Sequence, residues 1–523
     1  MKSSFRRLVS GTTLALTIAV GMPAASAADA PVHVSATLRA NASGPTVNPA
    51  VFGQFAEDLG HSIYGGVWVG PKSKIPNTDG YRTDVLHALQ ALKVPVVRWP
   101  GGCFADRYDW RDGVGPADKR PMTENVSWGG VDDDNSFGTP EYMKFMQLIG
   151  ARTFVAGNVG SEPPSLLAHW VDYMTSTSHS KWAQMRRRDG RDKPWRLNYL
   201  GVGNELWGCG GNMTADYAAD LLRRYVTFVH VDGPQHTDII GPGANGDDYA
   251  WIDTLMKKAG RFMNGIGLHY YVIPGGWSHM QPASQFDEAG WIDTLSKALY
   301  MNTLVSKDSA IMDKYDPKKR VSLVVDEWGT WFKAEQGTNP AFLYQQNTLR
   351  DGMVAALTLN IFVHHADRVR MANIAQMVNV LQAMILTKGD KMILTPTYYV
   401  FKMFIPYQGA EALPLKLDTP AYTLGKVSVP AVQGSAVRGK DGKVHMVLVN
   451  LDPHKAAQVA VRLEGMSAHG VSGQILTGPQ MNTHNTFAHP DTIKPEAFDG
   501  AHVRGASLEA KLPAKSIVVL DVD

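Results

Sequence analysis

The chain has 523 residues, a formal net charge of +2 at pH 7, 44% hydrophobic residues and 19% charged residues. A nearly neutral chain of this length argues against nucleic acid or an anionic membrane as an electrostatic partner, and it is long enough for two or three hydrophobic cores. The 13 Trp and 18 Tyr residues suit a neutral ligand bound against aromatic rings, although large cores also use aromatic residues.

The N-terminus is typical of a secretory signal peptide. The basic segment MKSSFRR precedes the apolar run LVSGTTLALTIAVGM, and the small residues ASA (25–27) suit a cleavage site. We therefore expect a signal peptide over residues 1–27 and a protein exported to the periplasm or the medium. Its removal takes three positive charges, which changes the net charge from +2 to −1. No later segment has about 18 consecutive apolar residues, so no membrane partner is expected after cleavage.

Eight short apolar runs between about residues 50 and 370 are typical of strands. They are VFGQF (51–55), VVRWPGG (96–102), TFVAGNV (153–159), NYLGVGNE (198–205), TDIIGPG (237–243), GIGLHYY (265–271), VSLVVDEWG (321–329) and FVHHADRV (362–369). Amphipathic helical patterns such as TDVLHALQALK lie between them. Nearly continuous apolar strands that alternate with helices predict a parallel sheet covered on both faces. Eight such units match a (β/α)₈ TIM barrel better than an open sheet, so we expect a catalytic α/β barrel over residues 46–390.

The pattern changes after about residue 390. KVHMVLVNLD, QVAVRLEG, GVSGQILTG and AKSIVVLDVD show the alternation of strands, separated by Gly, Pro and Asn turns and with little helical periodicity. This predicts a C-terminal antiparallel β-sandwich, of jelly-roll type, over residues 391–523. We expect the early segment PVHVSATLRA, within residues 28–45, to add a strand to that sandwich.

Two of the predicted barrel strands end in a glutamate. Glu205 closes the fourth strand and Glu327 closes the seventh, in VVDEWGTW. The working residues of such barrels lie at the C-terminal ends of the strands, and these two strands are separated around the ring, so the two carboxylates can face each other across the mouth. Facing carboxylates are the minimal equipment for glycoside hydrolysis. A single glutamate in such a place is more often a helix cap or a loop ion pair.

Longer segments around these strand ends resemble glycoside hydrolase family 51, the α-L-arabinofuranosidases. The resemblance is carried by AEDLGHSIYGGVWV, VVRWPGGCFADRYDWRDGVGP, LGVGNELWGCGGNMTADYAADLLRRY, VVDEWGTW and HHADRVRMANIAQMVNVLQAMILT, in this order. It implies a retaining exo-glycosidase that releases terminal α-L-arabinofuranosyl groups from arabinose-containing plant polysaccharides or oligosaccharides. It also implies a homo-oligomer, with no particular number of copies.

The resemblance assigns roles to individual residues. Glu205 would be the acid/base and Glu327 the nucleophile. The expected substrate-binding residues are Glu57 in FAEDLG, Arg98 at the end of strand two, Cys103 in PGGC, Asn204 before the acid, Tyr271 in LHYY, Trp331 and Gln376 in IAQMVN. Outside the family context, ordinary roles are more frequent for three of them: a surface ion pair for Glu57, a core aromatic for Tyr271 and a polar helix face for Gln376.

The chain departs from the family at Cys103. Many members have PGGN where this chain has PGGC, so a thiol, which is a weak hydrogen-bond partner, stands where an asparagine contacts arabinose. Cys209 lies just beyond a strand end on the same face, and the chain has two cysteines in all. One hypothesis is a Cys103–Cys209 disulfide at the rim of the site, and two buried free cysteines are the alternative; the sequence does not decide between them.

No metal and no cofactor is expected. The run DDDN (132–135) lacks the glutamate that a calcium-binding loop has at its twelfth position. His364 and His365 are adjacent in the predicted eighth strand, so at most one of them faces the site. Two other functions remain open: the same double-displacement machinery with β-xylosidase or endo-β-glucanase specificity, and a non-catalytic carbohydrate-binding protein on a decayed barrel.

Overall fold

The computed structural model describes residues 30–232 and 236–523, so the expected signal peptide over residues 1–27 lies outside the described residues. Eight strands close into a parallel barrel: β2 (Gly53–Phe55), β5 (Val96–Trp99), β8 (Arg152–Gly157), β9 (Tyr199–Val202), β10 (Asp238–Asn245), β11 (Gly265–Val272), β12 (Ser322–Thr330) and β13 (Val369–Ile374). They follow one another around the ring in chain order, and β13 pairs with β2 to close it. The predicted (β/α)₈ barrel is therefore confirmed.

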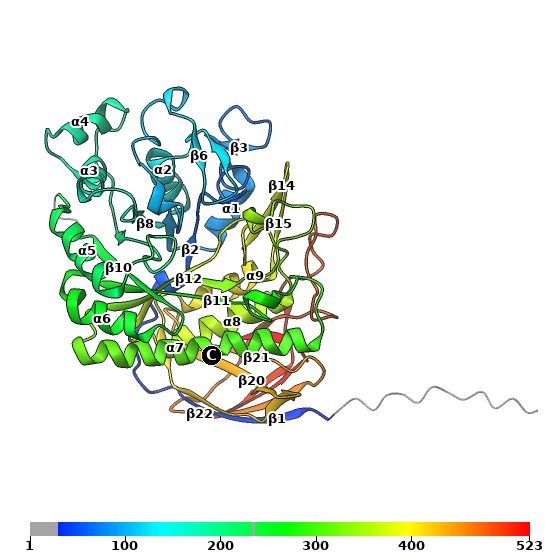
Figure 1. Cartoon of the computed structure of the whole chain (residues 1–523). Coiled ribbons are helices and arrows are strands. Elements are labelled where there is room, and N and C mark those ends of the chain that lie inside the picture. Colours follow the sequence, from blue (N-terminus) through cyan, green and yellow to red (C-terminus); the bar gives the residue numbers. More distant parts are fainter. Residues whose placement is uncertain (1–29, 233–235) are drawn as a thin grey trace, which may run out of the picture.

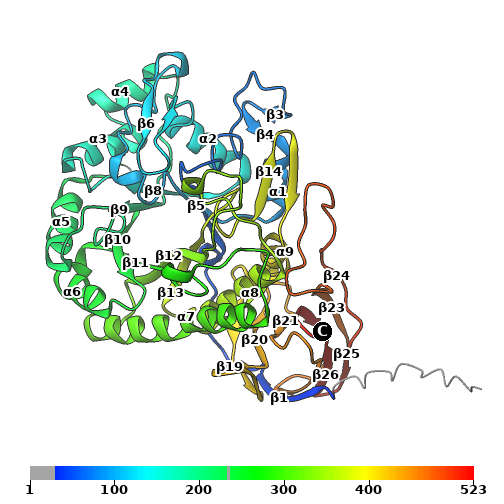
Figure 2. The same cartoon turned by 45° about the vertical axis from the view of Figure 1, so that its right-hand side comes forward.

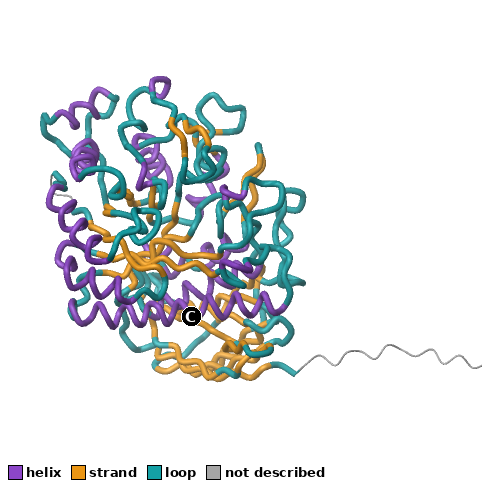
Figure 3. The backbone as a smooth tube through the Cα atoms, in the orientation of Figure 1, coloured by secondary structure: helices purple, strands orange, loops and turns teal. Residues whose placement is uncertain are grey.

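Helices cover the outside of the barrel, as Figures 1 and 3 show. They are α1 (Thr83–Ala91), α2 (Thr139–Ile149), α3 (Pro164–Thr175), α4 (Lys181–Arg188), α5 (Ala215–Phe228), α6 (Tyr249–Ala259), α7 (Glu288–Tyr315) and α8 (Leu349–His364). Inside the barrel, a separate apolar layer is formed by Ala50, Val96, Phe154, Tyr199, Ile240, Val324 and Met371. The strands are apolar on both sides because one face fills this interior while the other packs against the helices.

The eighth barrel strand begins later than the sequence predicts. The predicted strand over 362–369 was placed on the apolar run FVHHADRV, but helix α8 continues to His364 and β13 starts only at Val369. Almost every residue of α8 is buried, because the barrel covers one side of the helix and the sandwich covers the other. A helix that is apolar all round lacks the periodicity that distinguishes it from a buried strand. His364 consequently lies at a helix end, where its Nε2 is 2.9 Å from the carbonyl oxygen of Gly434, away from the mouth of the barrel.

Two stacked sheets form the C-terminal sandwich. The five-stranded sheet has the order β17 (Leu415–Asp418), β1 (Val32–Arg39), β22 (Ala457–Glu464), β26 (Ser507–Leu512), β25 (Ala501–Arg504). The six-stranded sheet has the order β16 (Glu411–Leu413), β20 (Val432–Arg438), β21 (Val444–Asn450), β27 (Ser516–Val522), β23 (Val471–Leu476), β24 (Glu496–Ala497). Neighbouring strands are antiparallel except β1 and β22, which run parallel. Figure 2 shows the blue β1 among these orange and red strands.

The six-stranded sheet joins the two units, because it is buried on both faces. Leu448 and Leu520 pack with the five-stranded sheet, while their neighbours Val447 and Val519 pack with the core that surrounds the barrel. Alternate residues of β21 therefore belong to two different hydrophobic cores, which explains why all seven residues of this strand are buried.

Short elements complete the chain. The hairpins are β3–β4 (Asn77–Thr78, Tyr81–Arg82), β6–β7 (Thr123–Asn125, Val131–Asp133), β14–β15 (Ile385–Lys388, Lys391–Leu394) and β18–β19 (Ala421–Leu424, Val427–Pro430), and α9 spans Pro396–Met403. Residue 390 lies in the turn of β14–β15. Within the described ranges, no helix combines the length and apolar character that crossing a bilayer would need.

Candidate active site

The residues singled out in the sequence come together in one pocket at the C-terminal mouth of the barrel. The pocket is lined by Glu57, Leu59, Gly102, Cys103, Trp128, Glu205, Tyr271, Glu327, Trp331, Leu343, Gln376 and Leu381. Two expected residues lie outside this set, Arg98 and Asn204, and both are buried. Arg98 donates hydrogen bonds to Asn204 and to Glu327. Side chains from six of the eight strand ends therefore converge on a single cavity.

A tight turn after β9 presents Glu205 to the pocket. Gly203 has φ +92° and Glu205 itself has φ +38°, a left-handed conformation that is uncommon for a residue with a side chain. The backbone N–H groups of Gly208 and Gly210 donate to the Glu205 carbonyl oxygen at 2.7 and 3.1 Å and hold the turn. His269 Nδ1 lies 2.9 Å from Glu205 Oε1. Burial raises the pKa of the Glu205 carboxyl more than this hydrogen bond lowers it, and nearby Glu327 adds to the rise.

Glu327 is held by a donor on each carboxylate oxygen. Arg98 Nη1 donates to Oε1 at 2.7 Å, and the Tyr271 hydroxyl donates to Oε2, also at 2.7 Å. The sequence places Glu327 at the end of its strand, whereas β12 continues past it to Thr330. An oxygen of Glu327 and an oxygen of Glu205 lie within 4.8 Å of each other. This separation is too short for the water molecule that an inverting glycosidase places between its carboxylates.

Arg98 connects Glu327 to Asn204 through one hydrogen bond to each. Its guanidinium packs over the Phe55 ring at 4.6 Å, and its Nη2 donates to Asn204 Oδ1 at 2.7 Å. Asp326 Oδ2 lies 3.7 Å from Arg98 Nε. Because Arg98 is only 1% exposed, its charge is balanced by these groups and by Glu327 and not by water.

Glu57 is a buried acceptor and not a surface ion-pairing residue. Its Oε1 accepts hydrogen bonds from the backbone N–H groups of Gly102 and Phe104 and from Trp128 Nε1, at 3.0, 3.1 and 2.9 Å. Gln376 Nε2 donates to Oε2 at 3.1 Å, and Gln376 Oε1 accepts from the Glu57 backbone N–H. Burial and the neighbouring Glu327 raise the pKa of Glu57 to about 7.

Three residues of the site were not identified from the sequence. His269 bridges the carboxylates, with its Nδ1 3.6 Å from Glu327 Oε2 and its Nε2 3.4 Å from Asp326 Oδ1. A signal for it existed, because it precedes Tyr271 by two positions and alternate residues of a strand share a face. No such signal existed for Asp326, because adjacent residues of a regular strand point to opposite faces and Asp326 directly precedes Glu327. A register shift between Val325 and Trp328 nevertheless brings both carboxylates to Arg98.

Trp128 is the third site residue that was not identified from the sequence. It lies in an irregular loop, and the sequence of this loop does not predict where the side chain lies. Burial opposes a charge on His269, but Glu327 and Asp326 raise the pKa of its imidazole well above the usual value.

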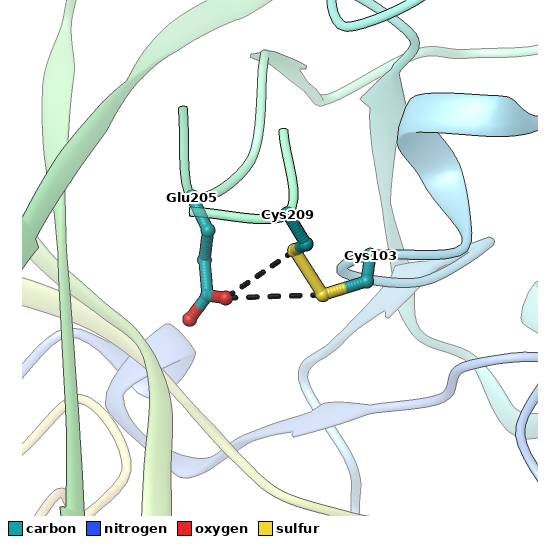
Figure 4. A group of neighbouring side chains, drawn as sticks. All are labelled: Cys103, Glu205 and Cys209. Atoms are coloured by element: carbon teal, nitrogen blue, oxygen red, sulfur yellow. Dashed lines mark hydrogen bonds between the residues drawn. A yellow bond between two sulfur atoms is a disulfide. The ribbon is translucent and has the colours of Figure 1, made fainter. Parts of the chain in front are cut away.

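The two cysteines are bridged, which confirms the disulfide hypothesis. The Cys103–Cys209 sulfurs are 2.07 Å apart, and the disulfide lies against the Glu205 side chain (Figure 4). Glu205 Oε2 is 3.4 Å from Cys209 Sγ and 3.8 Å from Cys103 Sγ. Bridged sulfurs carry no proton, so Glu205 can only donate to them, and only when it is protonated. Cys103 therefore enters the pocket wall as half of a disulfide and not as a thiol.

An aromatic wall leads from the pocket to the surface. Trp331 packs edge-on against Tyr271 with ring centroids 5.1 Å apart, and Trp277 packs edge-on against Trp331, also at 5.1 Å. Trp277 is 67% exposed. Aromatic faces of this kind are suited to the apolar faces of sugar rings.

Comparison with known proteins corrects the expected export. An intracellular exo-α-L-arabinofuranosidase of Bacteroides ovatus is 47% identical over 487 residues, which is 93% of this chain and 95% of that protein. The expected signal peptide and secretion were therefore wrong. They rested on basic residues before an apolar run, which is a short compositional pattern.

The same comparisons agree on the family. A family model of the α-L-arabinofuranosidase 1 domain matches residues 88–287, and a model of the α-L-arabinofuranosidase C-terminal domain matches residues 326–516. The crystal structure of a family 51 arabinofuranosidase from Xanthomonas axonopodis pv. citri is 56% identical, with a TM-score of 0.93, and the match covers 94% of this chain and 100% of that one. An α-L-arabinofuranosidase from Thermotoga maritima, crystallised with arabinose, is 27% identical with a TM-score of 0.83 over 94% and 99% of the two chains. This chain belongs to the α-L-arabinofuranosidases of glycoside hydrolase family 51.

Proposed function

We propose that this α-L-arabinofuranosidase is a retaining exo-enzyme in which Glu327 attacks the anomeric carbon while Glu205 protonates the departing oxygen. The observation that carries this proposal is the approach of the two carboxylates to within 4.8 Å in one pocket. The acid must hold a proton and the nucleophile must be ionised, and the environments of the two carboxyl groups differ accordingly. Burial favours a proton on Glu205, whereas Arg98 and Tyr271 both donate hydrogen bonds to Glu327.

In the first step, Glu327 forms an ester bond to the anomeric carbon as the glycosidic bond breaks, and the leaving oxygen takes the proton of Glu205. In the second step, Glu205 removes a proton from water, the resulting hydroxyl attacks the same carbon, and the ester to Glu327 breaks. Two inversions give net retention. Asn204, fixed through its Oδ1 by Arg98, is proposed to contact the sugar 2-hydroxyl, a contact that strengthens in the transition state.

The remaining expected residues are proposed to bind the arabinosyl group. Glu57 and Gln376 form a rigid pair on one wall and can accept and donate hydrogen bonds to sugar hydroxyls. Cys103, as part of the disulfide, and Trp331 also line the pocket.

We propose terminal arabinofuranosyl groups of plant polysaccharides or oligosaccharides as the substrate. Support comes from the exo activity named for the Bacteroides ovatus relative and from the arabinose named for the Thermotoga maritima structure. The relatives favour neither the β-xylosidase nor the endo-β-glucanase alternative, and as a glycosidase the protein is no mere sugar-binding barrel.

A homo-oligomer is part of the proposal, and light scattering after gel filtration tests it. We also propose that residues 46–390 form the catalytic unit and that 28–45 and 391–523 form the sandwich unit. The separate apolar cluster between the two sheets supports this division.

The roles of the two glutamates can be separated with aryl arabinofuranosides of different leaving-group acidity. Glu327→Ala is expected to abolish turnover on every substrate. Glu205→Ala is expected to retain activity on 4-nitrophenyl α-L-arabinofuranoside, whose leaving group needs little protonation, and to lose it on arabinoxylan and branched arabinan. Glu496→Ala, at an exposed strand position of the sandwich, is the matched control. Equal losses on activated and unactivated substrates in the Glu205 variant would reverse the assignment.

A further inference from the structure

The disulfide occupies an unusual place, because it touches the proposed acid/base and is reachable from solvent. Cys209 is exposed and Cys103 is half-buried, on two loops that meet beside the pocket. Figure 4 shows the Glu205 carboxylate facing both sulfurs, at 3.4 Å from Cys209 Sγ and 3.8 Å from Cys103 Sγ. A small dithiol in solution can therefore reach the bond.

Reduction would change what these groups can do. A dithiol reductant transfers two electrons and two protons to the Cys103–Cys209 bond through a mixed disulfide, and it leaves as its own cyclic disulfide. The protein then has two thiols where it had none, next to a carboxylate. The two sulfurs and one Glu205 oxygen already lie within 4.8 Å of one another.

Two thiolates and a carboxylate are ligands that zinc prefers. Tetrahedral zinc, with Zn–S bonds of about 2.3 Å and Zn–O bonds of about 2.1 Å, needs ligand atoms about 3.5–3.8 Å apart. The two sulfur–oxygen separations here, 3.4 and 3.8 Å, are close to that spacing. Only the sulfur–sulfur distance must increase from its bonded value, by rotation of side chains whose Cα atoms are 5.6 Å apart. The fourth position would be left to water.

We propose that reduction of the Cys103–Cys209 disulfide creates a zinc site whose ligands are the two thiolates and Glu205, and that zinc bound there inhibits hydrolysis of the substrate. Binding releases two thiol protons to solvent as two Zn–S bonds form. Inhibition follows because a carboxylate oxygen that ligates zinc cannot donate or accept the catalytic proton. This part of the inference rests on the proposed acid/base role of Glu205, whereas the binding itself does not.

A second group of possible ligands offers a built-in comparison. Atoms of Glu205, His269 and Glu327 also lie within 4.8 Å of one another, and this group is the same whether the disulfide is intact or reduced. Zinc bound through these residues would inhibit both forms equally. Dependence on reduction therefore identifies the thiolates as ligands.

The test uses the untagged full chain, oxidised or reduced with dithiothreitol and then freed of reductant by gel filtration under nitrogen. Each form is equilibrated with zinc and assayed for bound metal and for the release of arabinose from arabinoxylan, a substrate whose leaving group needs the Glu205 proton. Cobalt replaces zinc in a parallel sample, because thiolate-to-cobalt absorption reports the ligands without reference to activity. We expect the reduced form to bind one more zinc per chain, to show the thiolate absorption and to lose at least tenfold in activity, which a chelator restores.

The variant with both Cys103→Ser and Cys209→Ser serves as the thiol-free control, with its activity compared with and without zinc in the same preparation. It is expected to bind no additional zinc after treatment with reductant. Equal zinc binding by the oxidised and reduced forms, or equal zinc inhibition of the double variant, overturns the site. Thiolate-dependent binding without loss of activity overturns the inhibition, because zinc then leaves the Glu205 carboxylate free or Glu205 is not the acid/base. The Glu205→Ala measurements on activated and unactivated substrates test the acid/base role separately, so the two failures can be told apart. A Cys103→Ser single variant, which keeps the Cys209 thiol but cannot form the disulfide, is expected to bind zinc equally with and without prior treatment with reductant; a gain of zinc on reduction in this variant also overturns the site.

Discussion

The contact between Tyr271 and the proposed nucleophile can be removed with little other change. Replacing Tyr271 by Phe deletes the hydroxyl that donates to Glu327 Oε2 at 2.7 Å and keeps the ring that packs against Trp331. Arg98 continues to donate to the other carboxylate oxygen. The nucleophile then has one close donor in place of two, and its side chain is free to rotate about the remaining ion pair.

The expected loss of kcat/KM in the Tyr271→Phe variant follows from the burial of the hydrogen bond between Tyr271 and Glu327. A hydrogen bond to a charged group contributes about 1.5–3 kcal/mol, and the upper half of this range applies because Glu327 is only 6% exposed and water cannot replace the hydroxyl. Since about 1.4 kcal/mol corresponds to a factor of ten in rate, Tyr271→Phe should lower kcat/KM by about 30- to 150-fold. The unfolding midpoint should change little, because the packing of the ring is retained.

The adjacent tyrosine supplies the matched control. Tyr270 points to the other side of β11, where its hydroxyl donates to the carbonyl oxygen of Lys297 at 2.9 Å. Steady-state kinetics on 4-nitrophenyl α-L-arabinofuranoside should show near-normal kcat/KM for Tyr270→Phe and the large loss for Tyr271→Phe. A loss below about threefold in the Tyr271 variant, or equal losses in both, would refute the positioning role.

Three further predictions test other contacts. His269→Asn removes a hydrogen bond that lowers the pKa of Glu205, so the alkaline limb of the kcat/KM profile, where Glu205 loses its proton, should move to higher pH. Gly102→Ala places a Cβ 2.8 Å from Glu327 Oε1 and should lower kcat about 100-fold in a variant whose circular dichroism is unchanged. Burial raises the pKa of Asp106 to about 7, above its unfolded value, so stability from its neutral form is present at low pH and is lost as the pH rises through 7. Asp106→Asn mimics the neutral form, and its unfolding free energy relative to the wild type, measured in urea, should increase by about 2–3 kcal/mol between pH 5 and pH 8.

Each of these predictions has a clear contrary result. An alkaline limb that stays in place or moves down in the His269 variant would contradict the electrostatic account of Glu205. Near-wild-type kcat in the Gly102 variant would show that the nucleophile can shift without cost. A pH-independent difference between Asp106→Asn and the wild type would mean that the carboxyl is ionised throughout this range.

Much of the fold and the centre of the site were predictable because they depend on local patterns. Repeated apolar strands with helices between them specify a barrel, and the ends of parallel strands share one face, so Glu205 and Glu327 could be expected to converge. The family resemblance supplied the other expected residues, and the pocket contains or adjoins all of them.

What the sequence did not predict depends on non-local structure. Helix α8 is covered on all sides by two units, and no amphipathic period marks it. Asp326 reaches Arg98 only because of a register shift in β12, which no simple alternation predicts. Trp128 lies on a loop and reaches Glu57 through a hydrogen bond that depends on the folded arrangement of that loop.

The position of β1 has a consequence for how the chain can be divided. This strand is the first described element, yet it lies between β17 and β22 in the five-stranded sheet. All eight barrel strands therefore lie in the sequence between β1 and the other strands of the sandwich. No single cut separates the two units. A chain trimmed to begin at the barrel would leave the edges of β17 and β22 unpaired, and such open edges invite association with other chains. The five-stranded sheet therefore cannot be completed until β17 and β22, some four hundred residues after β1, have been synthesised.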